Sequence, residues 1–249
     1  MKLRLIRSAT MRIVYNHLTF VTDPYLSQKH GMPSYTGASP NPLVDLPCPP
    51  EDVVTGVDFA VISHLHSDHF DPPARRLLPR DLMIFCQPAD VAALEAAGFR
   101  HILPVTEPRQ HAGITLTRIP GQHGSGDVLD EMGPASGFVL RAADEPTVYW
   151  MGDTVWCPVV AETLKAVRPD IVITHSGGAQ WADHVPIIMD APQTVAVCRA
   201  APQATVVAVH MEALDHQTVT RADLRAYADA QGISRDHLRI PADGERLTF

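Results

Sequence analysis

The octet Ser63–Phe70 (SHLHSDHF) follows directly on the apolar run Phe59–Ile62. On a helix, two residues at i and i+2 point about 200° apart, so His64 and His66 could not reach the same ion. At the end of a β-strand alternate residues share a face, and the same two imidazoles can converge. The octet therefore predicts a strand that runs into a metal-binding loop. Within six positions it offers four side chains that bind metals in proteins: His64, His66, Asp68 and His69.

The spacing within the octet indicates more than one metal position. Asp68 and His69 are consecutive, so their side chains diverge and more naturally serve a position beside the first. Three further candidates come directly after apolar β-type runs, which is where α/β sheets present ligand-binding groups. A single histidine at a strand end is more often a hydrogen-bonded structural residue, but seven such coincidences favour a metal site. The three are His123, Asp153 and His210.

Two different patterns of apolar residues along the chain predict the fold. Short β-type pieces between Leu3 and Val21 are typical of an antiparallel meander. Later, buried-type strands alternate with helical stretches, which indicates an α/β protein with packed sheets and helices outside. The expected strands are 59–63, 82–86, 114–120, 137–150, 170–174 and 204–209, and the expected helices are 88–98, 158–167, 190–201 and 220–230.

The segment Pro24–Pro50 contains seven prolines. Proline fixes φ and lacks an amide donor, so this segment cannot be a central strand or a long helix. We expect a long irregular connection. Such loops often form lids or pocket walls, although a surface excursion without a role is equally compatible with the composition.

Charge and composition restrict the kinds of molecule that the protein is expected to bind. The net charge is −8 and the basic residues show no cluster beyond Arg75–Arg76, so a nucleic acid is not expected. No apolar stretch approaches the roughly 18 residues of a membrane span, and the N-terminus does not resemble a signal peptide. Four widely separated cysteines favour reduced thiols. We therefore predict a cytoplasmic protein with a small-molecule substrate, which could be a homo-oligomer.

The motifs together resemble a known family. HLHSDH, GQHG, GDT and a histidine after the last long strand match the pattern of the metallo-β-lactamase superfamily. The phrases TDP, MGDTVW, GGAQW, PIIMDAPQT and VHMEALDH are further similar to the branch of small metal-dependent hydrolases that includes the L-ascorbate-6-phosphate lactonases.

This resemblance implies a four-layer αββα sandwich that spans residues 1–249 as one metallo-hydrolase domain. It implies that His64, His66 and His123 hold a first metal, that Asp68, His69 and His210 hold a second, and that Asp153 bridges them. Nitrogen and carboxylate ligands suit Zn²⁺, with Mn²⁺ or Fe as alternatives.

Two divalent metals about 3.5–4 Å apart would generate a bridging hydroxide at neutral pH and polarise the bond under attack. The sequence has no G-x-S-x-G motif for a serine nucleophile. The expected activity is hydrolysis of a small ester, a lactone or a phosphorylated sugar derivative. The alternatives are a phosphodiesterase or nuclease and, last, a metal or redox protein without hydrolase activity.

Further residues are expected around this site. Asp68 is the expected group to orient the water or accept its proton, and Asp23 is expected to brace the ligand loop. His175 could contact substrate, donate a proton to the leaving group, orient a ligand or lie in solvent, and His216 could contact substrate or orient a ligand. His184 is expected at the rim, and Trp156 and Trp181 could wall the pocket or belong to the core. No role is assigned to His17, His30, His101, His111 and His237.

Overall fold

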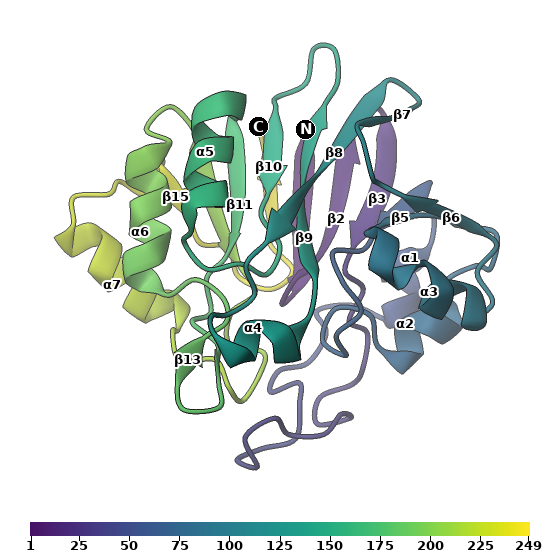
Figure 1. Cartoon of the computed structure of the whole chain (residues 1–249), viewed down its shortest axis with the longest axis horizontal. Helices are drawn as coiled ribbons and strands as arrows, with labels where there is room; N and C mark the ends of the chain where they lie inside the picture. Colours follow the sequence, from purple (N-terminus) through teal and green to yellow (C-terminus); the bar gives the residue numbers. More distant parts are fainter.

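Two seven-stranded mixed sheets pack face to face in the computed structural model, which describes residues 1–249 (Figure 1). The first sheet has the spatial order β16-β1-β2-β3-β4-β5-β6 and the second the order β15-β14-β11-β10-β9-β8-β7. The first consists of β1 (Lys2–Arg7), β2 (Thr10–Tyr15), β3 (Leu18–Thr22), β4 (Phe59–Val61), β5 (Met83–Cys86), β6 (His101–Pro104) and β16 (Arg246–Thr248). The second consists of β7 (Arg109–His111), β8 (Ile114–Gly121), β9 (Ala135–Arg141), β10 (Val148–Trp150), β11 (Ile171–His175), β14 (Thr205–Val209) and β15 (Leu238–Arg239).

Helices cover the outer face of each sheet (Figure 1). The first sheet carries α1 (Pro50–Val54), α2 (Pro72–Leu77) and α3 (Val91–Ala96), which follows the 3₁₀ turn η1 (Pro88–Asp90). The second carries α5 (Pro158–Val167), α6 (Ala191–Ala200) and α7 (Arg221–Ala230). A short helix, α4 (Asp127–Met132), and the hairpin of β12 (Gln180–Trp181) and β13 (Val185–Pro186) lie at one end of the sandwich. The predicted αββα fold is confirmed.

The layers follow from which side chains each strand buries. A cluster of 21 buried residues fills the space between the sheets, with Leu5 and Phe59 from the first sheet and Trp150 and Ile173 from the second. Alternate residues of the same strands face outward and join two further clusters under the helices. The central parallel strands are therefore apolar on both faces, which explains why they appear as continuous apolar runs in the sequence.

Most long elements agree with the sequence prediction. The opening meander, the strands around residues 59, 83, 171 and 205, and the four predicted helical stretches are all present. The shorter helices α1, α2 and α4 were not predicted, since five or six residues are too few to show a helical period. No helix of the structure is both long enough and apolar enough to cross a membrane.

The 24–50 segment is irregular, as predicted, and its isolated β-bridge pairs Met32 with Asn41. The backbone hydrogen bond from Leu43 N to Ala213 O and the side chains of two polar residues hold it in place. Arg7 is fully buried beneath it and donates hydrogen bonds to three carbonyl groups, those of Tyr25, Ser27 and Val44. From the other side, the carboxylate of Asp215 accepts hydrogen bonds from Ser34 Oγ, Tyr35 N, Thr36 N, Thr36 Oγ1 and Asn41 Nδ2. The loop is thus an ordered part of the fold.

A buried carboxylate before α3 gives a pH-dependent prediction. Asp90 is 7% exposed, its Oδ2 has no hydrogen-bond partner, and burial raises its pKa to about 6. A pKa above the ordinary 3.8 stabilises the fold at low pH, and this contribution is lost as the pH rises through about 6. Asp90→Asn removes this cost, so its free energy of unfolding at neutral pH is expected to exceed that of the parent by up to about 3 kcal/mol. Denaturant unfolding should show no such gain near pH 4, and a gain of equal size at both pH values would contradict the prediction.

Candidate metal centre

The predicted ligands come together at one end of the sandwich, beside α4, the β12–β13 hairpin and the 24–50 loop (Figure 1). Each follows a strand or ends one. The octet leaves β4, His123 follows β8, Asp153 follows β10 and His210 follows β14. Because β10, β11 and β14 run parallel, their carboxyl ends meet at this edge.

The turn after β10 requires glycine. Gly152 has a φ of +64°, and a Cβ at this position would lie 2.3 Å from the carbonyl oxygen of Ser136. Only a residue without a side chain allows the strand to turn this closely against β9 and direct Asp153 into the centre.

Four imidazoles share one orientation, in which Nδ1 contacts the protein and Nε2 faces the centre. Such partners fix the tautomer and the direction of a metal-binding histidine. As predicted, Asp23 braces the octet. Its carboxylate accepts hydrogen bonds from the amide and the hydroxyl of Ser63, in addition to contacting His69. The Nδ1 partners are Ser63 Oγ for His64 (2.9 Å), Asp23 Oδ2 for His69 (2.7 Å), Ile187 O for His123 (2.8 Å) and Ser8 Oγ for His210 (2.6 Å).

His66 has the opposite orientation. Its Nε2 lies 3.0 Å from the carbonyl oxygen of Met132, and its Nδ1 lies 3.3 Å from Nε2 of His123. The candidate ligand atoms form two groups, each with all its atoms within 4.8 Å of one another. The first group is His64, His66 and His123, and the second is His69, Asp153, His175 and His210.

Two atoms of this cluster are buried without a hydrogen-bond partner, namely Nε2 of His64 and Nε2 of His69. A buried polar atom without a partner destabilises a fold by about 1–3 kcal/mol unless something binds it. The donor set of imidazole nitrogens and carboxylate oxygens, without thiolate, suits a divalent transition metal. The residues present therefore fit a metal centre.

Asp153 lies between the two groups and is 3% exposed. Its Oδ2 lies 3.2 Å from Nε2 of His69, 3.4 Å from Nε2 of His123 and 3.9 Å from Nε2 of His64. Its Oδ1 lies 3.7 Å from Nε2 of His210. A single carboxylate thus faces the ligand atoms of both groups.

Asp68 lies beside the second group. Its Oδ2 is 3.5 Å from Nε2 of both His69 and His210, and its Oδ1 accepts a hydrogen bond of 3.2 Å from the hydroxyl of Tyr35. The second group also contains His175, which the ligand set implied by the family resemblance did not include.

The electrostatics of the cluster suit a bound cation. Burial lowers the pKa of His64 well below its ordinary value and that of His123 to about 4, so both rings are neutral and have a free lone pair. Burial opposes ionisation of Asp153, but the surrounding imidazoles, His69 first among them, hold its pKa well below the ordinary value. For His69, burial is outweighed by the carboxylates of Asp153, Asp68 and Asp23, which raise its pKa well above 6.5. Positive charge is therefore favoured at this point.

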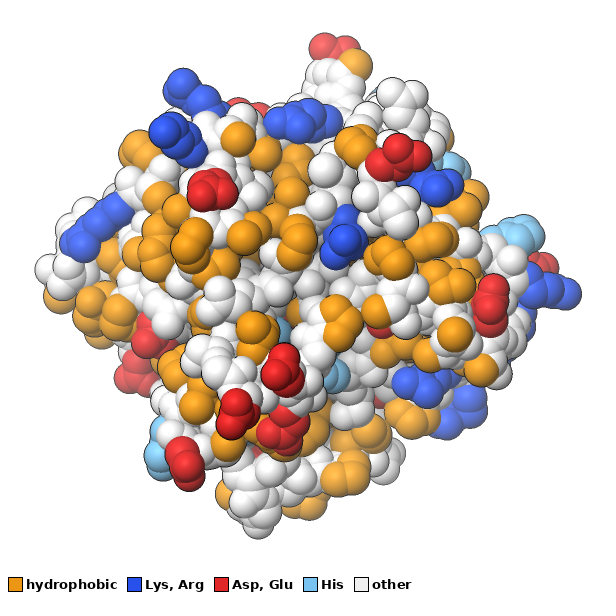
Figure 2. All heavy atoms as spheres, in the orientation of Figure 1, with side chains coloured by type: hydrophobic (Ala, Val, Ile, Leu, Met, Phe, Trp, Pro, Cys, Tyr) orange, Lys and Arg blue, Asp and Glu red, His pale blue; other side chains and the backbone are white.

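A cavity of about 270 Å³ opens over the cluster. One wall is aromatic, formed by Trp181 and by Tyr35 of the 24–50 loop, whose hydroxyl lies 2.7 Å from Ser67 Oγ. An outer groove adjoins this cavity and is lined further out by Thr36, Gln180, His184 and Thr218. No lysine or arginine lines the cavity or this outer groove. Figure 2 shows one face of the molecule, on which acidic side chains gather over α4 with no Lys or Arg side chain among them. The eleven lining residues are Tyr35, His66, Ser67, Asp68, His123, Glu131, Met132, Asp153, Trp181, Ile187 and His216.

The remaining sequence candidates lie in different places. His216 lines the cavity, with its ring edge against Tyr35 at 4.7 Å, and His184 is exposed on the outer groove. His175 is 1% exposed, lies beneath the cluster and does not line the cavity, a position that suits orienting a ligand better than contacting substrate. Trp156 packs against the α5 and α6 side of the second sheet instead of the cavity.

Sequence reasoning missed Tyr35, Glu131, Met132 and Ile187. Tyr35 is the one aromatic residue in the middle of the proline-rich segment, and that isolated position was the only signal available. The other three lie on α4 and after β13, elements too short to be predicted.

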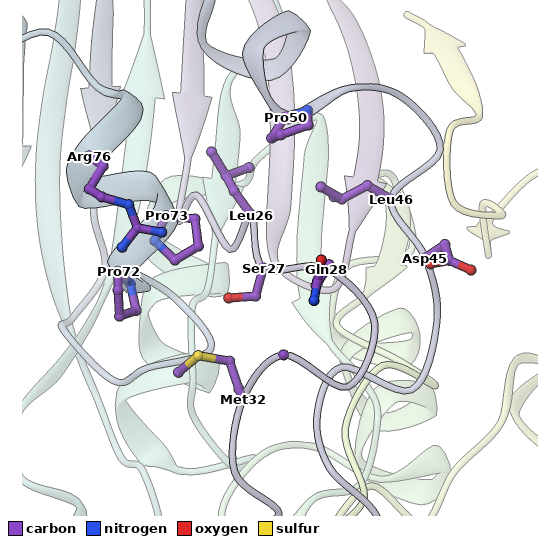
Figure 3. Close-up of a pocket in the computed structure, with 11 residues that line it drawn as sticks. Leu26, Ser27, Gln28, Met32, Asp45, Leu46, Pro50, Pro72, Pro73 and Arg76 are labelled. Carbon is purple, nitrogen blue, oxygen red and sulfur yellow. The ribbon is translucent and has the colours of Figure 1, made fainter.

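A larger hollow of about 680 Å³ lies on the other side of the 24–50 loop, between that loop and α2 (Figure 3). Prolines and the side chains of Leu26, Leu46 and Met32 surround it, with Arg76 and Asp45 at its margins. It contains none of the clustered ligand atoms. The smaller cavity over the histidines is therefore the candidate site.

Comparisons with known proteins agree with this geometry. The sequence model of the beta-lactamase superfamily domain matches residues 19–211. The UPF0173 protein YddR of Bacillus subtilis is 34% identical over 255 residues, covering 100% of both chains. Two crystal structures cover 100% of this chain and 99% of their own. One is an isothiocyanate hydrolase from Delia radicum gut bacteria (37% identity, TM-score 0.93), and the other is a possible metal-dependent hydrolase from Veillonella parvula (34%, 0.96).

The αββα layers, the histidine and aspartate cluster at their edge and these full-length similarities lead to one assignment. The chain belongs to the metallo-β-lactamase superfamily and is one of its metal-dependent hydrolases.

Proposed function

We propose that this hydrolase acts on small neutral substrates with an apolar substituent, and that isothiocyanates are the preferred class. The observation that carries this proposal is the cavity itself, which is small, partly aromatic and free of cationic side chains. The full-length similarity to an isothiocyanate hydrolase supports the same chemistry, since both chains have nearly the same backbone. We further propose that residues 1–249 act as one domain, because both sheets contribute to a single central core.

We propose a binuclear centre with the ligands implied by the family. His64, His66 and His123 would hold one ion, Asp68, His69 and His210 the other, and Asp153 would contact both. The fixed ring orientations and the two unpartnered Nε2 atoms support this set. Zinc is the metal that we expect first, with manganese or iron as alternatives. Two such ions would lower the pKa of water and polarise the bond under attack.

Asp68 and His216 are proposed to accept and donate protons during the reaction. Oδ2 of Asp68 faces the centre while the Tyr35 hydroxyl holds Oδ1, so this carboxylate can orient water and accept its proton. His216 lies on the cavity wall, its Nδ1 is buried without a partner, and burial lowers its pKa. A neutral imidazole at this position can exchange a hydrogen bond with the substrate.

For an isothiocyanate, hydrolysis consumes one water and releases a primary amine and carbonyl sulfide. The water oxygen bonds to the central carbon, one water proton goes to the nitrogen, and the second follows when the carbon–nitrogen bond breaks. His216 is proposed to pass a proton to this nitrogen, because its ring lines the cavity beside Tyr35.

Phosphorylated substrates suit the cavity less well. Proteins usually bind phosphate through arginine, lysine or helix N-termini, whereas this cavity presents the carboxylates of Asp68, Glu131 and Asp153. The phosphorylated sugar and the phosphodiester, both compatible with the sequence, are therefore less favoured than a lactone, an ester or an isothiocyanate.

A substrate panel tests the proposal. We expect the metal-loaded protein to release amine and carbonyl sulfide from phenethyl isothiocyanate faster than it hydrolyses a lactone, a carboxylic ester or a phosphodiester. Trp181→Ala should raise KM for the phenethyl substrate about tenfold, as loss of roughly 1.4 kcal/mol of aromatic contact predicts, and affect methyl isothiocyanate much less. Trp156→Ala, which removes a tryptophan outside the cavity, is the matched control. Preference for the phosphodiester, or equal effects of the two tryptophan variants, would overturn the proposal.

A further inference from the structure

A buried chain of three side chains lies beneath the cluster: Trp150, His175 and Asp153. Trp150 ends β10 and His175 ends the neighbouring parallel strand β11. Both are 1% exposed, and neither lines the cavity. The ring of His175 packs among the ligand imidazoles, 4.9 Å from that of His210 and 5.8 Å from that of His69. Its role is therefore exerted through its neighbours.

The indole of Trp150 determines which nitrogen of His175 carries the proton. Trp150 Nε1 lies 3.0 Å from Nε2 of His175, and an indole N–H can only donate. Nε2 of His175 must therefore accept, so the neutral ring carries its hydrogen on Nδ1. This Nδ1 lies 2.5 Å from Oδ1 of Asp153, to which it donates.

The alternative, in which His175 binds a metal through Nδ1, conflicts with Trp150. Nδ1 would have to lose its hydrogen and its bond to Asp153, and in the neutral ring that hydrogen would move to Nε2. Two N–H donors would then face each other at 3.0 Å in a buried site, and an unpaired buried donor destabilises by about 1–3 kcal/mol. Distance alone places His175 in the second group, but hydrogen-bond chemistry separates it from the ligands.

The bond to His175 also makes the two oxygens of Asp153 unequal. Oδ1 is held by a donor, whereas Oδ2 lies within 3.2–3.9 Å of Nε2 of His69, His123 and His64. With Oδ1 fixed, the carboxylate cannot rotate about its axis to exchange the two oxygens.

We infer that His175 is a positioning residue. Trp150 locks its tautomer, and its Nδ1–H holds Oδ1 of Asp153 so that Oδ2 faces both ligand groups. This inference rests on the proposed metal centre for its consequence, but the tautomer itself does not depend on metal.

The test separates these two parts. In ¹⁵N NMR of the metal-free protein, His175 should show a protonated Nδ1 and an unprotonated Nε2. Trp150→Phe removes the donor that faces Nε2 while Asp153 still accepts from Nδ1–H, so the ¹⁵N signal of Nε2 should move downfield, and Trp156→Phe should leave it unchanged. The opposite tautomer in the parent protein would overturn the inference. A parent protein with this tautomer that binds no metal would instead overturn the proposed function.

Metal titration of metal-free variants tests the consequence. His175→Asn retains a donor near the Nδ1 position and should bind the same number of ions as the parent. His175→Ala should still bind that number, but about 10–100-fold more weakly, as expected when a partner of a metal ligand is removed. If His175 were a ligand, both variants would lose one ion per chain, and that result would overturn the inference. Trp150→Phe provides a second measurement if His175→Ala fails to fold, since it should weaken binding without lowering stoichiometry.

Discussion

Asp153→Asn is expected to lose metal and activity together. The asparagine keeps the size of the side chain but removes the negative charge and replaces one oxygen with an amide nitrogen, which cannot bind a metal. Since Asp153 faces both ligand groups, this one substitution is expected to weaken metal binding at both proposed positions. A bound metal would lower the pKa of the attacking water, and without it that pKa would rise, so we expect turnover to fall on the order of a thousandfold or more.

The measurement combines metal analysis of the purified protein with turnover under metal excess. Asp183→Asn, an exposed aspartate in the β12–β13 hairpin, is the matched control and should behave as the parent. If Asp153→Asn retained the parent's metal content, Asp153 would not be the carboxylate shared by the two positions.

Removal of the metal is expected to lower the melting temperature as well as abolish turnover. The folded protein buries unpartnered imidazole nitrogens and several carboxylates, which costs free energy. A bound cation would offset this cost, and it would do so only in the folded state, where the ligands are gathered. A ligand present at a thousand times its Kd stabilises the folded state by about 4 kcal/mol. For a chain of this size each kcal/mol corresponds to about 2–4 °C, so a chelator should lower Tm by roughly 8–16 °C.

Calorimetry with and without chelator measures this shift, and added zinc should restore both Tm and turnover. Asp153→Asn is the informative comparison, because a protein that already lacks metal should melt at the same temperature with or without chelator. A parent protein whose Tm and turnover both resist exhaustive chelation would contradict the metal-centre proposal.

The candidate site shows where sequence reasoning succeeds. All seven residues proposed as metal ligands follow apolar strand-like runs, and the structure brings their side chains to one edge of the two sheets. The local pattern was sufficient because a strand end has a defined place in an α/β fold. The cavity wall had no such pattern. Tyr35 reaches it only because Asp215, 180 residues away, holds the backbone of the 24–50 loop.

The sequence alone determined the layered α/β fold and the residues that gather at its edge, because period-two burial and strand-end positions are local properties. It left four roles open for His175. Only the tertiary structure places the indole of Trp150 against one nitrogen of that ring and Asp153 against the other. A histidine's tautomer depends on which groups face its two nitrogens, and here both groups come from the end of β10, which meets His175 only when β10 and β11 pair.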